Sequence, residues 1–197
     1  KSVGNLTVKL TNALEKIKPD LVICMGDRYE LLSLGSVITI LNIPLAHISG
    51  GEITLGAIDD QIRHSMSKLS HFHFVANKKA KSRLSQLGET NNSVFVIGSP
   101  DIDVMRKEEL PSLKYVKDYY GIKFDEFGIL LFHPIATEQN TLKKQISTLT
   151  SALKESKKNY VVIFPNNDLG SDIILHNYSN LKENKNFKIF PSIKFQN

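Results

Sequence analysis

The sequence contains a single cysteine, Cys24, within the apolar stretch LVICM. One cysteine cannot form an internal disulfide, so the chain is not a disulfide-stapled secreted domain, and we expect Cys24 to be a small buried hydrophobe. No apolar run approaches the ~20 residues of a membrane span, and Lys1 is not followed by an apolar signal segment. These absences predict a cytoplasmic protein with no membrane partner.

Motifs for nucleic acids, phosphate loops and metals are also missing. The net charge of +5 comes mostly from dispersed lysines without interleaved aromatic residues, which indicates a solvated surface with a mild preference for anions and no nucleic-acid partner. Neither GxxxxGK[ST] nor GxGxxG occurs. His71 and His73 would share one face of a strand, but no third ligand lies nearby, so we expect no metal.

The 197 residues do contain short apolar runs that alternate with helical patterns. The first series predicts strands at Leu21–Met25, Pro44–Ile48, His73–Ala76 and Val94–Ile97, with helices near 3–17, 28–41, 59–69 and 77–87. The second series predicts strands at Ile129–His133, Tyr160–Phe164 and near 187–190, with helices near 138–156 and 170–182. Such alternation predicts an α/β fold with parallel sheets and right-handed crossovers.

The polar, charge-rich stretch near 104–124 separates the two series and has room for a short helix of its own. It predicts two Rossmann-like domains, at 1–105 and at 106–197, the second beginning with the linker. Ligands of such folds bind at the carboxyl ends of the strands. Polar clusters that follow a predicted strand are therefore the candidates for a site.

The first cluster, GDRYE, places Asp27 at the end of a strand and Arg28 at the start of a helix. Two interpretations stay open. Asp27 and Glu30 have the spacing of a capping box, in which Asp27 would be the N-cap. Alternatively, Asp27 faces a ligand-binding cleft at the carboxyl ends of the strands.

The second cluster, HISGGE, ends the next strand. Gly50 and Gly51 permit backbone conformations closed to other residues and let the chain approach a ligand closely, although a plain glycine turn fits equally well. His47 lies inside an apolar strand and is expected to be a hydrogen-bonded core histidine rather than a catalyst.

The segment IDDQIRHSMSKLS gives an amphipathic helix. Its apolar stripe consists of Ile58, Ile62, Met66 and Leu69. Asp59 and Arg63 lie four apart on the flank of this stripe, which suits a sheltered carboxylate held ionised for use as a base. Asp60 and His64 lie on the opposite, more solvent-facing side. The alternative is two acids favoured by the helix dipole, with surface ion pairs.

Two clusters belong to the second series. FHPIA places His133 at a strand end, and FPNNDLGS places Asn166, Asn167 and Asp168 after the next strand, with Ser171 at a helix start. Amide and hydroxyl groups there suit a sugar or a phosphate. A turn followed by a helix cap from Ser171 is the alternative.

The chain contains GDRYE, HISGGEITLGAIDDQIRHSMSKLSHFHF, VIGSPDID, FHPIA and FPNNDLGS, in this order. The order and spacing of these motifs carry a family resemblance. Over nearly its whole length the chain resembles the hydrolysing UDP-N-acetylglucosamine 2-epimerases, which supply N-acetylmannosamine, or its diacetylated 6-deoxy analogue, for sialic and legionaminic acid synthesis. The resemblance implies two Rossmann-like domains of the GT-B type. It also implies release of UDP from a UDP-sugar, inversion at C2 through a glycal intermediate, and no metal or redox cofactor.

The resemblance carries over to individual positions. Asp27 matches the family's aspartate after the first motif strand, Asp59 the acid of its IDD, and Arg28 a nucleotide-binding position, while His133 and Asn166 match substrate-contacting positions. With the strand-end clusters, this predicts catalytic roles for Asp27, Glu52, Asp59 and His133, and substrate-binding roles for Arg28, Ser49, Gly51, Arg63, His64, Asn166, Asp168 and Ser171.

One departure concerns Ser49, because some members have a glutamate there that is a catalytic candidate. We hypothesise that Glu52 supplies the missing carboxylate. Near-full turnover by Glu52→Gln, with loss of turnover in Asp59→Asn, would contradict this.

A second departure is length, since family members are roughly twice as long and extend beyond both ends of this chain. We expect each domain to be incomplete here, the 197 residues alone to be inactive or nearly so, and the full-length protein to form dimers or tetramers. Two alternatives remain: a non-hydrolysing 2-epimerase that recaptures UDP, and a fragment that binds nucleotide sugar without chemistry.

Overall fold

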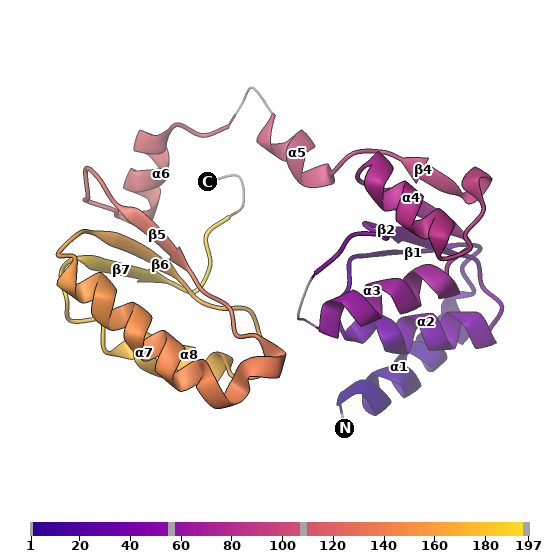
Figure 1. Ribbon diagram of the computed structural model, residues 1–197, viewed down its shortest axis with the longest axis horizontal. Helices are drawn as coiled ribbons and strands as arrows, with labels where there is room; N and C mark the ends of the chain where they lie inside the picture. Colours follow the sequence, from indigo (N-terminus) through magenta and orange to yellow (C-terminus); the bar gives the residue numbers. More distant parts are fainter. Residues whose placement is uncertain (1, 55–57, 107–109, 195–197) are drawn as a thin grey trace. The chain divides into compact units, whose positions relative to one another are not determined.

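The computed structural model describes residues 2–54, 58–106 and 110–194, which fold into two compact units. Unit 1 comprises Lys1–Asp103 and unit 2 comprises Val104–Asn197 (Figure 1). Each unit has its own parallel sheet and its own hydrophobic core.

Unit 1 is a four-stranded sheet in the order β1-β2-β3-β4, with every neighbouring pair parallel. Its strands are β1 (Val22–Met25), β2 (Leu45–Ile48), β3 (Phe72–Val75) and β4 (Val94–Val96). Its helices are α1 (Ser2–Ile17), α2 (Glu30–Ile40), α3 (Ile58–Leu69) and α4 (Lys78–Gln86), and α5 (Pro100–Met105) crosses the division between the units. A short 3-10 turn, Asn91–Ser93, precedes β4.

The helices of unit 1 cover one face of its sheet. On that face Cys24, His47 and His73 lie side by side in register and are buried. Burial raises the pKa of the Cys24 thiol to about 11, as suits the small buried hydrophobe that was predicted. On the opposite face of β1 the alternate residues Ile23 and Met25 are 60% and 52% exposed, so the two faces of this edge strand differ sharply in burial.

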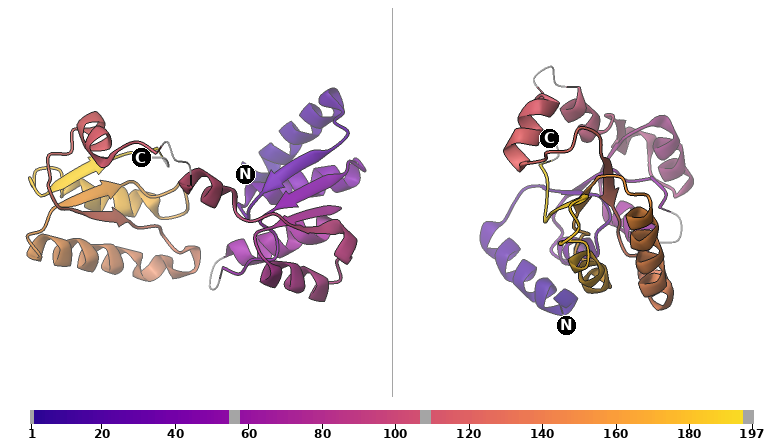
Figure 2. Two further views of the ribbon diagram at one scale, coloured as in Figure 1. Left: turned by 90° about the horizontal axis from the view of Figure 1, so that it is seen from above. Right: turned by 90° about the vertical axis from the view of Figure 1, so that its left-hand side faces the viewer.

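Unit 2 is a three-stranded parallel sheet in the order β5-β6-β7. Its strands are β5 (Gly128–Leu131), β6 (Tyr160–Ile163) and β7 (Phe187–Phe190), and its helices are α6 (Leu113–Tyr120), α7 (Gln139–Glu155) and α8 (Ser171–Ser179). A 3-10 turn, Ala136–Glu138, leads into α7. Figures 1 and 2 show α7 and α8 together against one face of this sheet and α6 against the other.

Local sequence explains several helix ends. The Asn77 side chain accepts a hydrogen bond from the Ala80 N–H (2.9 Å) and so caps α4. The Ser112 hydroxyl caps α6 in the same way, through the Tyr115 N–H (3.2 Å). Gly121, with φ +61°, ends α6 in the left-handed conformation that glycine adopts without strain.

The structure confirms the predicted α/β fold with parallel sheets, and the strand starts differ from prediction by one residue in most cases. The strand β3 begins at Phe72 instead of His73. The short helix for which the stretch near 104–124 has room is α6 (Leu113–Tyr120). In the described part of the chain, no helix is both long enough and apolar enough to cross a membrane.

Two capping interpretations are wrong. The N-cap of α2 is Tyr29, which makes no side-chain capping bond. Because α2 begins only at Glu30, Asp27 lies too early in the chain to cap it. The N-cap of α8 is Gly170, and Ser171 is already the first helical residue. The Ser171 hydroxyl donates backwards to the Asn166 carbonyl (2.6 Å), so the turn was predicted correctly and the cap was not.

Candidate active site

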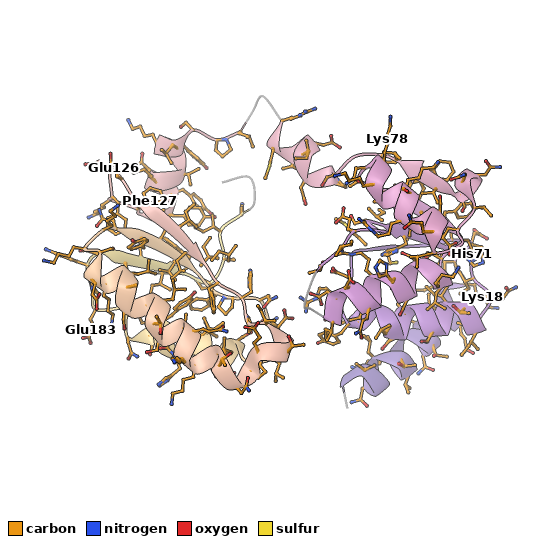
Figure 3. The ribbon with its side chains drawn as sticks, in the orientation of Figure 1. Lys18, His71, Lys78, Glu126, Phe127 and Glu183 are labelled. Atoms are coloured by element: carbon orange, nitrogen blue, oxygen red, sulfur yellow. The ribbon has the colours of Figure 1, made fainter. Side chains whose placement is uncertain are left out.

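The polar clusters of unit 1 lie at the carboxyl edge of its sheet. Asp27 follows β1, Ser49 to Glu52 follow β2, and Arg63 is on α3. The opposite, amino edge is marked in Figure 3 by Lys18 and His71, which precede β1 and β3. The predicted site residues of unit 1 therefore gather at the edge where parallel sheets bind ligands.

Arg63 connects the acids of this edge. Its guanidinium Nη2 forms an ion pair with Asp27 Oδ2, and its Nη1 lies 4.0 Å from Glu52 Oε2. The side chain of Arg63 is only 9% exposed, against 22% for Asp27 and 38% for Glu52. A buried cation thus holds two more exposed carboxylates side by side, and we call these three residues the Arg63 cluster.

The turn that presents Asp27 is fixed through the backbone of Gly26. Gly26 has φ +84°, a conformation that strains other residues, and its N–H donates to the Ile48 carbonyl (3.0 Å). Its own carbonyl accepts a hydrogen bond from His47 Nε2 (2.7 Å). Both backbone groups just before Asp27 are therefore occupied, which fixes the start of the Asp27 segment.

The turn that presents Glu52 is close-packed and strained. Ser49 has φ +64°, which is unusual for a residue with a side chain. Gly51 has φ +72°, and a Cβ there would lie 2.5 Å from the Ala80 carbonyl oxygen of α4. The Arg83 guanidinium of α4 donates to the Gly51 carbonyl. Arg83 was missed in the sequence, because nothing local indicates a contact 32 residues away.

The start of α3 supplies further polar groups. Asp60 Oδ1 accepts a hydrogen bond from the Thr54 N–H (3.0 Å), and Asp60 Oδ2 lies 3.7 Å from His64 Nε2. Asp60 and His64 were predicted to be solvent-facing, yet their side chains are only 30% and 28% exposed. Asp60 thus connects α3 to the chain just after Glu52, a role that the sequence did not suggest.

Asp59 is half-buried at the start of α3. It follows residues 55–57, which lie outside the described ranges. Its predicted pairing with Arg63 stays a prediction. The described ion pairs of Arg63 go to Asp27 and Glu52.

Two buried histidines lie behind this edge. His47 is fully buried with both ring nitrogens partnered, by the Gly26 carbonyl and by Ser67 Oγ (3.3 Å), which confirms the predicted core histidine. His73 Nε2 lies 3.2 Å from Glu89, which also pairs with Lys68. Burial lowers the pKa of both histidines, so both rings are neutral near pH 7.

Unit 2 has a different kind of carboxyl edge. The Asn166 N–H donates to His133 Nδ1 (3.0 Å), which ties the end of β5 to the end of β6. The Asn166 amide donates to the Asp168 carboxylate, and Gln139 of α7 donates to the Leu169 carbonyl (2.8 Å). This edge offers an imidazole, an amide and a hydroxyl next to the amino end of α8, groups that suit a sugar or phosphate oxygen.

The structure thus gathers the predicted residues into two groups, one in each unit. Arg28 lies at the first edge as an exposed cation, 3.3 Å from Glu30, with its guanidinium 5.8 Å from the centre of the Tyr29 ring. Within the described ranges, no group of three or more histidine, cysteine, aspartate or glutamate side chains is arranged to hold a metal ion. What the first edge can do chemically is present paired carboxylates beside a fixed cation.

Sequence comparison relates the chain to known enzymes. A family described as UDP-N-acetylglucosamine 2-epimerase matches residues 1–197. The UDP-N-acetylglucosamine 2-epimerase of Neisseria meningitidis serogroup B is 42% identical over 194 residues, 98% of this chain and 51% of that protein. The GDP/UDP-N,N′-diacetylbacillosamine 2-epimerase (hydrolyzing) of Campylobacter jejuni is 39% identical over 202 residues, 100% of this chain and 52% of that protein. The chain spans about half the length of these curated relatives.

Solved structures show the same fold. The Methanocaldococcus jannaschii UDP-GlcNAc 2-epimerase, crystallised with UDP-GlcNAc and UDP, matches with a TM-score of 0.76 at 20% identity, over 98% of this chain and 56% of that one. The Neisseria meningitidis enzyme bound to UDP-GlcNAc gives 0.75 at 20% identity, over 98% and 55%. These likenesses show two Rossmann-like units of the GT-B type. Since the family match extends over all 197 residues, the chain belongs to the UDP-N-acetylglucosamine 2-epimerase family.

Proposed function

We propose that the protein carrying this chain is a hydrolysing UDP-N-acetylglucosamine 2-epimerase, which releases UDP and yields free N-acetylmannosamine or a diacetylated 6-deoxy analogue. The observation that carries the proposal is the Arg63 cluster, in which one buried guanidinium holds the carboxylates of Asp27 and Glu52 at a strand-end edge. The chain covers about half of its relatives, so the proposal concerns the whole protein.

The chemistry explains why carboxylates are needed. The C2 proton of such a sugar has no neighbouring carbonyl to acidify it, so it leaves only as the anomeric C–O bond breaks and positive charge builds on the ring. A fixed carboxylate stabilises that charge, and another takes the proton. The electron pair of the C2–H bond then forms the C1–C2 double bond of a glycal, and UDP departs with the electrons of the C–O bond.

Within the Arg63 cluster we assign roles by exposure. Asp27 is bound directly by Arg63 and is fixed in orientation, which suits stabilisation of the developing charge. Glu52 is more exposed and lies 4.0 Å from Arg63, which leaves its carboxylate free to reach the proton at C2. Asp59, half-buried at the start of α3, is the further candidate for proton transfer during hydration of the glycal.

For unit 2 we propose a binding role. His133, Asn166 and Ser171 present hydrogen-bonding groups, and Asn166 and Ser171 lie at the amino end of α8, where a helix favours anions. A diphosphate or a sugar hydroxyl is the matching ligand. Arg28, exposed at the edge of unit 1, is the proposed cation for the nucleotide.

The names of two relatives support the proposal of hydrolysis. The hydrolyzing diacetylbacillosamine 2-epimerases of Campylobacter jejuni and Legionella pneumophila are 39% and 33% identical to this chain. The Neisseria meningitidis serogroup B relative, at 42% identity, is named only as a UDP-N-acetylglucosamine 2-epimerase, and a non-hydrolysing epimerase is the second candidate.

The test uses the full-length protein with UDP-N-acetylglucosamine and, separately, UDP-N,N′-diacetylbacillosamine, followed by proton NMR in D2O. A hydrolysing epimerase gives UDP and a free manno-configured sugar with deuterium at C2. A non-hydrolysing enzyme gives a manno-configured sugar still joined to UDP. Binding of either nucleotide sugar without turnover would reject both epimerase proposals.

A further inference from the structure

Two fully buried side chains, His47 and Ser67, lie directly behind the Arg63 cluster. His47 Nε2 is 2.7 Å from the carbonyl oxygen of Gly26, the residue before Asp27. Ser67 Oγ is 3.0 Å from the carbonyl oxygen of Arg63 and 3.3 Å from His47 Nδ1. The pair therefore connects the backbones that carry both partners of the Asp27–Arg63 ion pair, which lie 36 residues apart.

The third member of the cluster depends on the same pair. A Cβ added to Gly50 would lie 3.0 Å from His47 Nδ1 and 3.0 Å from Ser67 Oγ, so the turn before Glu52 rests directly on these two side chains. Three separate backbone segments thus meet on one imidazole and one hydroxyl. Close packing transmits any displacement of these two groups to all three segments.

The hydrogen positions follow from the partners. A carbonyl oxygen only accepts, so the proton of His47 is on Nε2 and is donated to Gly26. Burial lowers the pKa of His47 and keeps the ring neutral, which leaves Nδ1 as an acceptor, and the single proton of the Ser67 hydroxyl is shared between the Arg63 carbonyl (3.0 Å) and Nδ1 (3.3 Å). Turning the ring would leave the buried Gly26 carbonyl without its His47 donor, which fixes the ring in this orientation.

We propose that His47 and Ser67 are positioning residues for the Arg63 cluster. They touch no substrate; they set the distance between the two carboxylates and their shared cation. The kinetic part of this proposal rests on the proposed function, whereas the geometric part does not.

The variants separate the two contacts of the ring. In His47→Gln the side-chain amide reaches the Nε2 position and keeps a donor for the Gly26 carbonyl. In His47→Asn the shorter amide keeps only the position facing Ser67. Ser67→Ala removes the hydroxyl, and its matched control is Ser70→Ala, because Ser70 is also buried and its hydroxyl donates to the carbonyl four residues earlier, that of Met66 (2.7 Å), instead of to the backbone of Arg63.

The first readout is nitrogen-15 NMR of the arginine side chains in the 197-residue chain, since an ion pair slows rotation of the guanidinium. We expect His47→Asn and Ser67→Ala to speed rotation of the Arg63 guanidinium about tenfold, which is the effect on the rate of losing one charge-assisted hydrogen bond. We expect little change in His47→Gln and Ser70→Ala. Unchanged Arg63 rotation in folded His47→Asn would overturn the proposal, whether or not the protein is an epimerase.

The second readout is steady-state kinetics of the full-length protein. We expect His47→Asn to lower kcat about 100-fold with KM within a few-fold, because misplacement by about 1 Å has that effect, and His47→Gln to recover most of the loss. Equal losses in Ser67→Ala and Ser70→Ala, or a change in KM alone, would show a merely structural role. Absence of turnover in the unmodified protein would reject the proposed function and leave the NMR result to decide on positioning.

Discussion

At the carboxyl edge of the first sheet a buried cation, Arg63, holds two acids, whereas at the carboxyl edge of the second sheet His133 and Asn166 meet through one hydrogen bond of 3.0 Å. The first edge is charged and is supported from behind by buried polar side chains. The second edge presents an imidazole, an amide and one carboxylate, Asp168, and is half-open to solvent, and its main support is a backbone turn closed by Ser171.

Under the proposed function, the difference separates two tasks. Charge held in a partly buried place is costly unless its partners are fixed, so it suits a step in which charge develops on a substrate. Solvated neutral donors and acceptors lose little when they bind or release a ligand, so they suit reversible recognition. Changes at the first edge should therefore affect folding and activity together, and changes at the second edge should affect mainly function.

The largest effect is expected from Arg63→Met, which removes the buried cation that distinguishes the first edge from the second. Removing the cation leaves Asp27 partly buried without its ion-pair partner, and we expect the free energy of unfolding of unit 1 to fall by about 2–3 kcal/mol. This is below the range for a fully buried pair, because the Asp27 side chain is 22% exposed. Urea denaturation measures it.

Arg28→Met is the matched control for that change. Arg28 and Glu30 form an ion pair at 3.3 Å, but their side chains are 49% and 39% exposed, so removal should cost under about 0.5 kcal/mol. Equal losses of unfolding free energy in Arg63→Met and Arg28→Met would show that the Arg63 ion pair stabilises the fold no more than an exposed one.

The next effect compares positive-φ glycines of the two edges. In Gly51→Ala the new Cβ would lie 2.5 Å from a backbone oxygen, whereas in Gly170→Ala the nearest atoms, at 2.4 and 2.6 Å, are side-chain ends of Leu142 and Gln139. Side chains relax more easily than backbone, so we expect Gly51→Ala to cost about 2–3 kcal/mol and Gly170→Ala about 1–2.

Gly26→Ala provides the baseline for this series. It has φ +84° but no atom within 4 Å of the added Cβ, so it reports conformational strain alone, about 1 kcal/mol. Hydrogen exchange assigned to each unit measures all three variants. A larger loss in Gly170→Ala than in Gly51→Ala would show that the first edge is not the more rigid one.

The sequence predicted much of this arrangement because its signals are local. Apolar runs and turn residues mark strand ends, and parallel topology then brings Asp27 and Glu52 to one edge. The contact between Arg63 and Asp27 was harder to predict, since the two residues lie 36 positions apart and helical spacing suggested only Asp59, whose pairing with Arg63 stays a prediction. Ser67 and Arg83 were missed for the same reason, because side chains that contact distant backbone leave no periodic pattern.

Another effect depends on pH and tests the buried histidines behind the first edge. Burial lowers the pKa of His47 and His73, so below the ordinary histidine pKa of about 6.5 the unfolded chain binds protons that the folded chain does not. Stability is therefore full above this pH and falls as the pH decreases, by up to about 1.4 kcal/mol per pH unit for each histidine. Urea midpoints at pH 7.5, 6.5 and 5.5 measure the slope, and His47→Gln should reduce it. An unchanged slope in His47→Gln would remove His47 from the explanation.

The smallest effect on stability is expected from His133→Ala at the second edge. His133 is exposed, and water can replace the acceptor that its Nδ1 offers to the Asn166 N–H, so the free energy of unfolding of unit 2 should fall by less than about 0.5 kcal/mol. Turnover by the full-length protein should nevertheless fall at least tenfold if His133 contacts the substrate. His176→Ala is the control, because His176 lies on α8 outside the predicted site and should change neither quantity. A loss of stability as large as that of Arg63→Met would show that the second edge is structural like the first, and intact turnover would remove His133 from the site.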